Sequence, residues 1–174
     1  MSRQYKDNCI QIRPAKIEDM EAVAVLIQEL AEYEKMPEGP KLSVADLQRD
    51  GFESNPPVFR CLVAVEKNNN GTDDIVGYAI YFPTFSTWEG RSMMLEDLCV
   101  KQSHRRRGIG DKIFNAVAKE ATDSKCSRLD FHVLEWNPAR SFYNAKGAVN
   151  LTQLEQWCFY RLTGDALTKA AGQH

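Results

Sequence analysis

The sequence predicts an α+β fold, a mixed and mostly antiparallel sheet flanked by helices. Residues 58–66 and 75–85 are rich in β-branched and aromatic side chains and are joined by a polar turn, which is typical of an antiparallel hairpin. Two further strand-like runs, 93–101 and 129–134, enclose a helical pattern over 109–121. A strand–helix–strand order favours a parallel crossover, so we expect both kinds of pairing in one sheet.

The N-terminal third predicts one strand and two helices. Residues 9–13 alternate apolar and polar and end before Pro14, as a first strand would. Apolar residues over 18–35 recur at spacings of three and four, the pattern of an amphipathic helix packed on the core. Ser43 and Asp46 then form a capping-box pair that starts a short helix, which we expect to end at Gly51.

The C-terminal part predicts another helix and a last strand. Pro138 suits the first turn of a helix that runs through Tyr143 and stops at Gly147. Residues 156–163 alternate again and predict the final strand. With a polar extension at 1–8 and a weakly patterned tail at 165–174, we expect a single domain over 1–174.

Composition limits the classes of function. The net charge of −2 gives no overall field toward nucleic acid or anionic membranes, and the basic run at 104–107 stands alone. We expect neither a signal peptide nor a membrane span, since no apolar run approaches 18 residues. The five cysteines are too scattered for a metal site and suit a reducing compartment. The sequence therefore predicts a cytoplasmic protein without a metal.

One motif points to a ligand. Arg105-x-x-Gly108-x-Gly110 opens the helix predicted at 109–121. Backbone N–H groups at a helix start lack intrahelical partners and carry partial positive charge, and glycines let a pyrophosphate come close. The alternative is a loop whose glycines only turn the chain. Two adjacent carboxylates, Glu96 and Asp97, lie on the strand just before it and favour the ligand reading.

These residues resemble a known family. The run 105–110, Arg-Arg-Arg-Gly-Ile-Gly, matches the acetyl-CoA pyrophosphate loop of the GNAT superfamily of N-acetyltransferases. Within that superfamily the chain resembles the spermidine/spermine N1-acetyltransferase (diamine acetyltransferase) family at 30–34, 50–52, 95–97, 135–137, 142–143 and 155–157. Ser86-Thr87-Trp88 is nearer to the thialysine Nε-acetyltransferase branch. The resemblance covers about 12–164 and implies a GNAT sheet that splays between its fourth and fifth strands.

The resemblance also implies ligands and the residues that bind them. Acetyl-CoA is the expected coenzyme, no metal is expected, and a homodimer is expected. The implied coenzyme-binding residues are Leu98, Cys99, Val100, Arg105, Arg106, Arg107, Gly108, Ile109, Gly110, Asp111, Asn137 and Tyr143. The implied substrate-binding residues are Tyr33, Glu34, Trp88, Glu96, Asp97, Glu155 and Trp157. An acidic, aromatic-walled cleft of this kind suits a small cationic amine.

Glu96 is a catalytic candidate on chemical grounds, and the resemblance implies a catalytic role for Tyr143. An amine must lose its proton before it attacks a thioester, and Glu96 can accept that proton directly or through water. Adjacent strand residues face opposite sides, so Glu96 and Asp97 share a site only if a bulge interrupts the strand; otherwise one of them is structural. By resemblance, Tyr143 protonates the coenzyme's sulfur; alternatively it is a packed aromatic with a bonded hydroxyl.

Two departures from the family pattern affect these expectations. The segment from Asn137 to Tyr143 is one residue shorter than in the family, and one residue turns a helix face by about 100°. Ser86 stands where polyamine enzymes usually carry an acid, which favours a thialysine-like amino acid or a short diamine. Arg91 and Arg128 are candidates to hold the carboxylate of an amino acid, although solvated surface arginines are the more ordinary interpretation.

Three alternatives stay open from the sequence. The first is a spermidine/spermine N1-acetyltransferase proper. The second is an acetyltransferase acting on protein lysines or N-termini. The third, of another class, is a non-catalytic acetyl-CoA-binding interaction module.

Overall fold

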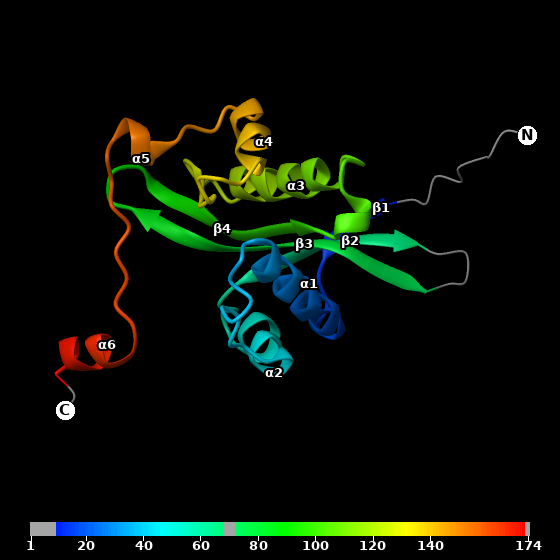
Figure 1. Ribbon diagram of the computed structural model, residues 1–174, viewed down its shortest axis with the longest axis horizontal. Coiled ribbons are helices and arrows are strands. Elements are labelled where there is room, and N and C mark those ends of the chain that lie inside the picture. The colour runs from blue at the N-terminus through cyan, green and yellow to red at the C-terminus, as the bar shows by residue number, and fades with distance from the viewer. Residues whose placement is uncertain (1–9, 68–71, 173–174) are drawn as a thin grey trace, which may run out of the picture. The chain divides into compact units, whose positions relative to one another are not determined.

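A computed structural model describes residues 10–67 and 72–172 (Figure 1). These residues form two compact units, one ending at His132 and one beginning at Val133, and each is described by itself. The predicted single domain over 1–174 stays a prediction. The predicted N-terminal extension at 1–8 and the start of the first strand at Cys9 lie outside the described residues.

The first unit is built on a five-stranded sheet, and its strand pairing is mixed, as predicted. Its order is β1 (Ile10–Pro14), β2 (Arg60–Lys67), β3 (Asp73–Ser86), β4 (Gly90–Val100) and β5 (Leu129–Phe131). The first three pairings are antiparallel and β4 pairs with β5 in parallel. The hairpin and the crossover expected from the sequence are therefore both confirmed.

Helices cover both faces of this sheet (Figure 1). A 3₁₀ turn (Ile17–Asp19), α1 (Met20–Tyr33) and α2 (Val44–Gln48) lie on one face, and α3 (Ile109–Asp123) lies on the other; a second 3₁₀ turn (Gln102–His104) follows β4. The apolar stripe of α1 is buried against alternate residues of the central strands. That core includes Met20, Val23 and Leu26 of α1 and Val63, Val65 and Tyr78 of the sheet.

The segment after α2 differs from the prediction. The Ser43–Asp46 capping box is present, but the helix does not end at Gly51, because it continues as a π-helical turn over Arg49–Glu53. The glycine is needed for packing instead. A Cβ at Gly51 would lie 2.7 Å from the Phe59 ring, closer than two non-bonded carbon atoms can approach.

A β-bulge interrupts β4 at the two acidic residues. Ile80 of β3 pairs with Asp97 and its neighbour Tyr81 pairs with Leu95, so Glu96 is the extra residue. A bulge changes which face later residues occupy. Before the bulge, Leu95 pairs with Tyr81, whose hydroxyl bonds Glu120 of α3. After the bulge, Asp97 accepts a hydrogen bond from Tyr78, which belongs to the core beneath α1.

The two parallel strands, β4 and β5, pair only at one end. Pairing between β4 and β5 runs from Met93–Leu129 to Leu95–Phe131 and stops there, although β4 continues to Val100. Beyond Leu95, β4 has no partner strand on that side among the described residues. This is the separation of the fourth and fifth strands that the GNAT fold implies.

The second unit contains α4 (Ala139–Ala145), α5 (Leu151–Leu154) and α6 (Gly164–Ala170). The helix predicted between Pro138 and Gly147 is confirmed, with Gly147 in a left-handed conformation just past its end. The tail predicted to be weakly patterned contains α6. None of the helices in the described part of the chain combines the length and apolar character needed to cross a bilayer.

The predicted last strand is wrong. Residues 156–163 have no regular secondary structure, and the side chains of Trp157, Phe159 and Tyr160 are exposed. Alternating apolar residues form a strand only beside a neighbour that completes its hydrogen bonds. In the described residues the sheet has β1 and β5 as its edges, and this segment is not part of it.

Candidate active site

The loop between β4 and α3 ends in an open helix start. Gly108 precedes α3 in a left-handed conformation, with φ of +73°. Among the described residues, no side chain caps this helix start. The first backbone N–H groups of the helix, those of Ile109 and Gly110, are therefore left for another acceptor, and the helix dipole favours an anionic one.

The two glycines fit a diphosphate for different reasons. At Gly108 the positive φ itself favours glycine. At Gly110 the backbone is ordinary, and a Cβ would only touch Val100 and Leu98 at 3.7 and 3.9 Å. The fold would thus accept alanine at 110, and glycine leaves the helix start open beside the end of β4. These residues fit the diphosphate of a coenzyme.

The three consecutive arginines have different surroundings. The Arg105 side chain donates to the Val100 carbonyl at 3.0 Å and stacks over the Tyr33 ring, 4.8 Å from its centroid. Arg107 donates to Glu66 at 2.8 Å. Arg106 is exposed with φ of +61°, and its side chain has no bonded partner among the described residues. Of the three, Arg106 is the one whose charge is available to a ligand.

Three predicted acidic residues gather at the bulge. The Asp97 carboxylate accepts a hydrogen bond of 3.1 Å from the hydroxyl of Tyr78, a fully buried residue that sequence reasoning missed. Burial raises the pKa of Asp97 to about 6; the Tyr78 bond opposes this rise, and the charges of Glu96 and Glu34 add to it. Burial also raises the pKa of Glu34. Glu96, the extra residue of the bulge, is exposed.

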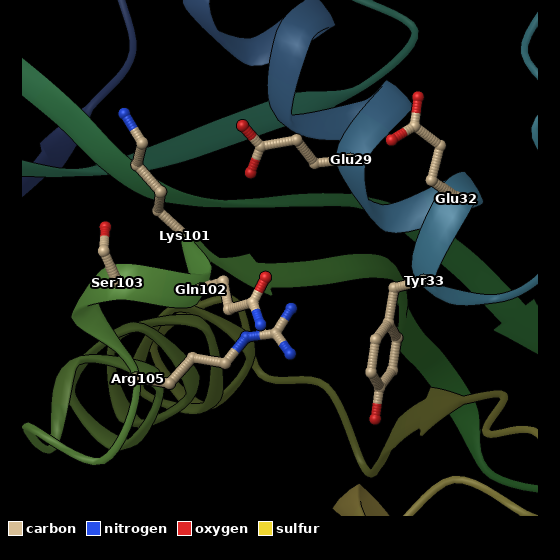
Figure 2. Close-up of a pocket in the computed structure, with 7 residues that line it drawn as sticks. All are labelled: Glu29, Glu32, Tyr33, Lys101, Gln102, Ser103 and Arg105. Carbon is tan, nitrogen blue, oxygen red and sulfur yellow. The ribbon is translucent and has the colours of Figure 1, made fainter.

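A pocket of about 580 Å³ adjoins the loop, between α1 and the segment after β4 (Figure 2). It is lined by Glu29, Glu32, Tyr33, Lys101, Gln102, Ser103 and Arg105. Figure 2 shows Tyr33 and Arg105 extending toward one another, so a predicted substrate-binding residue meets a predicted coenzyme-binding one. Sequence reasoning missed Glu29 and Glu32, although Glu29 lies three residues from Glu32 and four from Tyr33, spacings that place side chains on one side of a helix.

The turn that carries Trp88 is held from inside. The buried Ser86 hydroxyl accepts the backbone N–H groups of Trp88 and Glu89 at 3.2 and 3.3 Å. Arg128 donates to Glu89 at 2.8 Å and to Asp130 at 2.9 Å. The guanidinium of Arg128 is therefore paired within the protein, and Ser86 serves the turn. Trp88 itself is 83% exposed.

The remaining predicted residues lie in the second unit. Asn137 accepts the backbone N–H of Ala139 at 2.9 Å and so holds the start of α4. The Tyr143 ring on α4 packs edge-on against Phe142, with centroids 5.0 Å apart. The Trp157 indole donates to Glu155 at 2.6 Å, which brings these two predicted residues together. That they share a site with Glu96 stays a prediction.

The chain is similar to a known family and to proteins of known activity. Residues 23–148 match the acetyltransferase (GNAT) family. A thialysine N-epsilon-acetyltransferase of Bos taurus is 42% identical over 168 residues, covering 94% of this chain and 98% of the relative. A human spermidine/spermine N(1)-acetyltransferase-like protein 1 is 34% identical over 172 residues, covering 97% of this chain and 25% of that protein.

A solved structure shares the fold. An integron cassette protein from the mobile metagenome of V. cholerae superposes with a TM-score of 0.71 at 27% identity, over 93% of this chain and 97% of that one. Enzymes of the GNAT family use acetyl-CoA, and the uncapped helix start behind Gly108 suits its diphosphate. The chain belongs to the GNAT acetyltransferase family and is an acyltransferase that acts on amines.

Proposed function

We propose that the protein transfers the acetyl group of acetyl-CoA to a primary amine of a small cationic substrate, a thialysine-like amino acid or a short diamine or polyamine. The observation that carries this proposal is the bulge at Glu96. It gathers carboxylates one short loop away from the uncapped start of α3. An amine acceptor and a phosphate-bearing donor would then meet at the end of β4.

The carboxylates at the bulge supply proton acceptance and substrate attraction. An alkyl ammonium ion has a pKa near ~10.4, and a carboxylate with a raised pKa is a better acceptor for its proton than an ordinary one. With its pKa raised to about 6, Asp97 is still ionised at neutral pH. Glu96, exposed beside it, assists the deprotonation directly or through water, and Glu34 adds attraction for the cation.

The coenzyme would be held by the loop and supplied with a proton by Tyr143. Acetyl-CoA brings the acetyl group as a thioester, which an uncharged amine can attack. The N–H groups of Ile109 and Gly110 would bind its diphosphate, with Arg106 adding positive charge. Tyr143 would donate its hydroxyl proton to the departing sulfur.

The proposed substrate class is supported by the chain's relatives. Proteins named thialysine N-epsilon-acetyltransferase are 40–42% identical over 94% of the chain. The acidic residues Glu29 and Glu32 of the pocket, with Tyr33 beside them, add attraction for an amine. Because Arg128 is paired with Glu89 and Asp130, it is a poor choice to hold a substrate carboxylate.

A panel of amines tests the proposal. Initial rates with acetyl-CoA should give the highest kcat/KM for thialysine or a short diamine such as putrescine, lower values for spermidine and the lowest for spermine. Spermine as the best substrate would move the assignment to the spermidine/spermine enzymes. Acetylation of lysine peptides but of none of these amines would replace it with a protein acetyltransferase.

Two finer expectations belong to the same proposal. A homodimer in the cytoplasm accords with the family resemblance. Size-exclusion chromatography with light-scattering detection should give twice the mass of the chain. A mass of one chain at micromolar concentration would contradict the dimer.

A further inference from the structure

We infer that Glu66 is a positioning residue for the coenzyme: it holds the β4–α3 loop in the shape that presents its N–H groups to the diphosphate. This inference rests on the proposed function and concerns a residue outside the predicted coenzyme-binding and substrate-binding residues. Glu66 lies near the end of β2, whereas the loop follows β4. The bonds described next connect residues 38 and 41 positions apart in the sequence.

Both carboxylate oxygens of Glu66 are used. The Nε2 of His104 donates to one oxygen at 3.0 Å, and the Arg107 guanidinium donates to the other at 2.8 Å. The second ring nitrogen of His104 is hydrogen-bonded to the Ser103 hydroxyl at 2.8 Å. Three residues of the loop are thereby connected to one side chain of the sheet.

Burial makes this connection specific. Glu66 is only 7% exposed, and a buried carboxylate is costly unless its oxygens are bonded to charged or polar donors. The bonds from His104 and then Arg107 lower the pKa of Glu66, so the carboxylate stays ionised throughout the neutral range. The loop residues therefore stabilise the buried carboxylate of Glu66, and that carboxylate in turn fixes the positions of their side chains.

The anchored residues flank a strained one. Arg106, with φ of +61°, adopts a left-handed conformation that residues other than glycine seldom take. Such a conformation persists only where its surroundings enforce it. His104 and Arg107 stand on either side of Arg106, and Glu66 fixes both. Releasing them would let the backbone before Gly108 relax and would turn the N–H groups at the start of α3.

The same bonds explain how the arginines divide their roles. Because Glu66 neutralises Arg107, that side chain is not available to the coenzyme, and Arg106 is. Arg107 should therefore contribute to coenzyme binding only through Glu66. Replacing either partner should have the same effect, and replacing both should add little.

The test measures steady-state kinetics of Glu66→Gln. We expect the KM for acetyl-CoA to rise about tenfold, since a charge-assisted pair is weakened, while kcat and the KM for the amine change less than about twofold. Glu120→Gln is the matched control, because Glu120 also accepts two donors, Arg60 and Tyr81, but lies on α3 away from the loop. It should leave the KM for acetyl-CoA unchanged.

Arg107→Gln keeps the test valid should Glu66→Gln fail to fold, because Arg107 is exposed. It should raise the KM for acetyl-CoA by a similar factor, and the double variant should match the single ones. An unchanged KM in both single variants, or additive effects in the double variant, would overturn the inference. Calorimetric titration with coenzyme A gives the same comparison without turnover, so it separates this inference from the proposed reaction.

Discussion

At the scale of single residues, one carboxylate holds an unusual position. Asp97 is bonded to the buried Tyr78 hydroxyl and faces two other acids, and its pKa rises to about 6. The sequence could place Glu96 and Asp97 side by side but could not decide which face each occupies. That depended on a bulge, which comes from the register of β3 against β4 and not from any local pattern.

The raised pKa of Asp97 predicts a pH-dependent rate. The wild-type kcat/KM should increase as the pH rises through about 6, because Asp97 must lose its proton to accept one from the amine. In Asp97→Asn this increase should disappear and kcat/KM at pH 7.5 should fall at least about tenfold. Rates measured from pH 5 to 9 check this, with Glu96→Gln as the control that should keep the increase. An Asp97→Asn profile of wild-type shape would refute the role.

The same substitution should stabilise the protein at high pH. The pKa of Asp97 is higher in the folded state than in the unfolded chain, so its contribution to stability is greatest at low pH and is lost as the pH rises through about 6. Asparagine has no proton to lose, so it avoids the cost of ionising a buried group. We expect Asp97→Asn to raise the free energy of unfolding at pH 8 by about 1–3 kcal/mol. Urea titrations at pH 8 and pH 4 measure this. Equal stabilisation at both values would contradict the explanation.

At the scale of elements, the role of the glycine after α2 is set by packing and not by a helix end. Gly51 was expected to end the helix, yet the chain winds on through a π-helical turn to Glu53. Its missing side chain makes room for the ring of Phe59, eight residues later. A glycine required by a tertiary contact and a glycine at a helix end look alike in the sequence.

This packing predicts the effect of two substitutions. Gly51→Ala should destabilise the first unit by about 1–3 kcal/mol, because the new methyl group would overlap the Phe59 ring. Adding Phe59→Leu to it should cost less than the sum of the two single changes, since leucine leaves space for the methyl group. Chemical denaturation of the four proteins gives the comparison. Strictly additive effects would show that the two residues do not share this space.

At the scale of the whole molecule, predictions succeeded where neighbours in sequence are neighbours in space. The hairpin of β2 and β3, the crossover through α3 and the helix after Pro138 follow from local pattern, and all are present. Residues 156–163 carry a strand pattern without a partner strand among the described residues. Alternation shows that a segment can be a strand, but pairing depends on what lies beside it.

The candidate site was predictable to the same extent. The loop glycines stand out because they lie close together in the sequence, and the two acids of β4 stand out because they are adjacent. Tyr78 and Glu66, which position those residues, are a tyrosine and a glutamate within two ordinary strands. They gain their roles only from register and burial, and a single sequence displays neither.

Calorimetric titration of acetyl-CoA into the wild-type protein and Gly110→Ala tests the central claim most directly. The fold accepts a Cβ at residue 110 at ordinary contact distances, and alanine favours a helix more than glycine does, so the variant should unfold at or above the wild-type temperature. If the start of α3 binds the coenzyme's diphosphate, the wild type should bind one acetyl-CoA per chain and the variant at least about tenfold more weakly. No binding by the wild type, or equal affinity in the two proteins, would contradict the account.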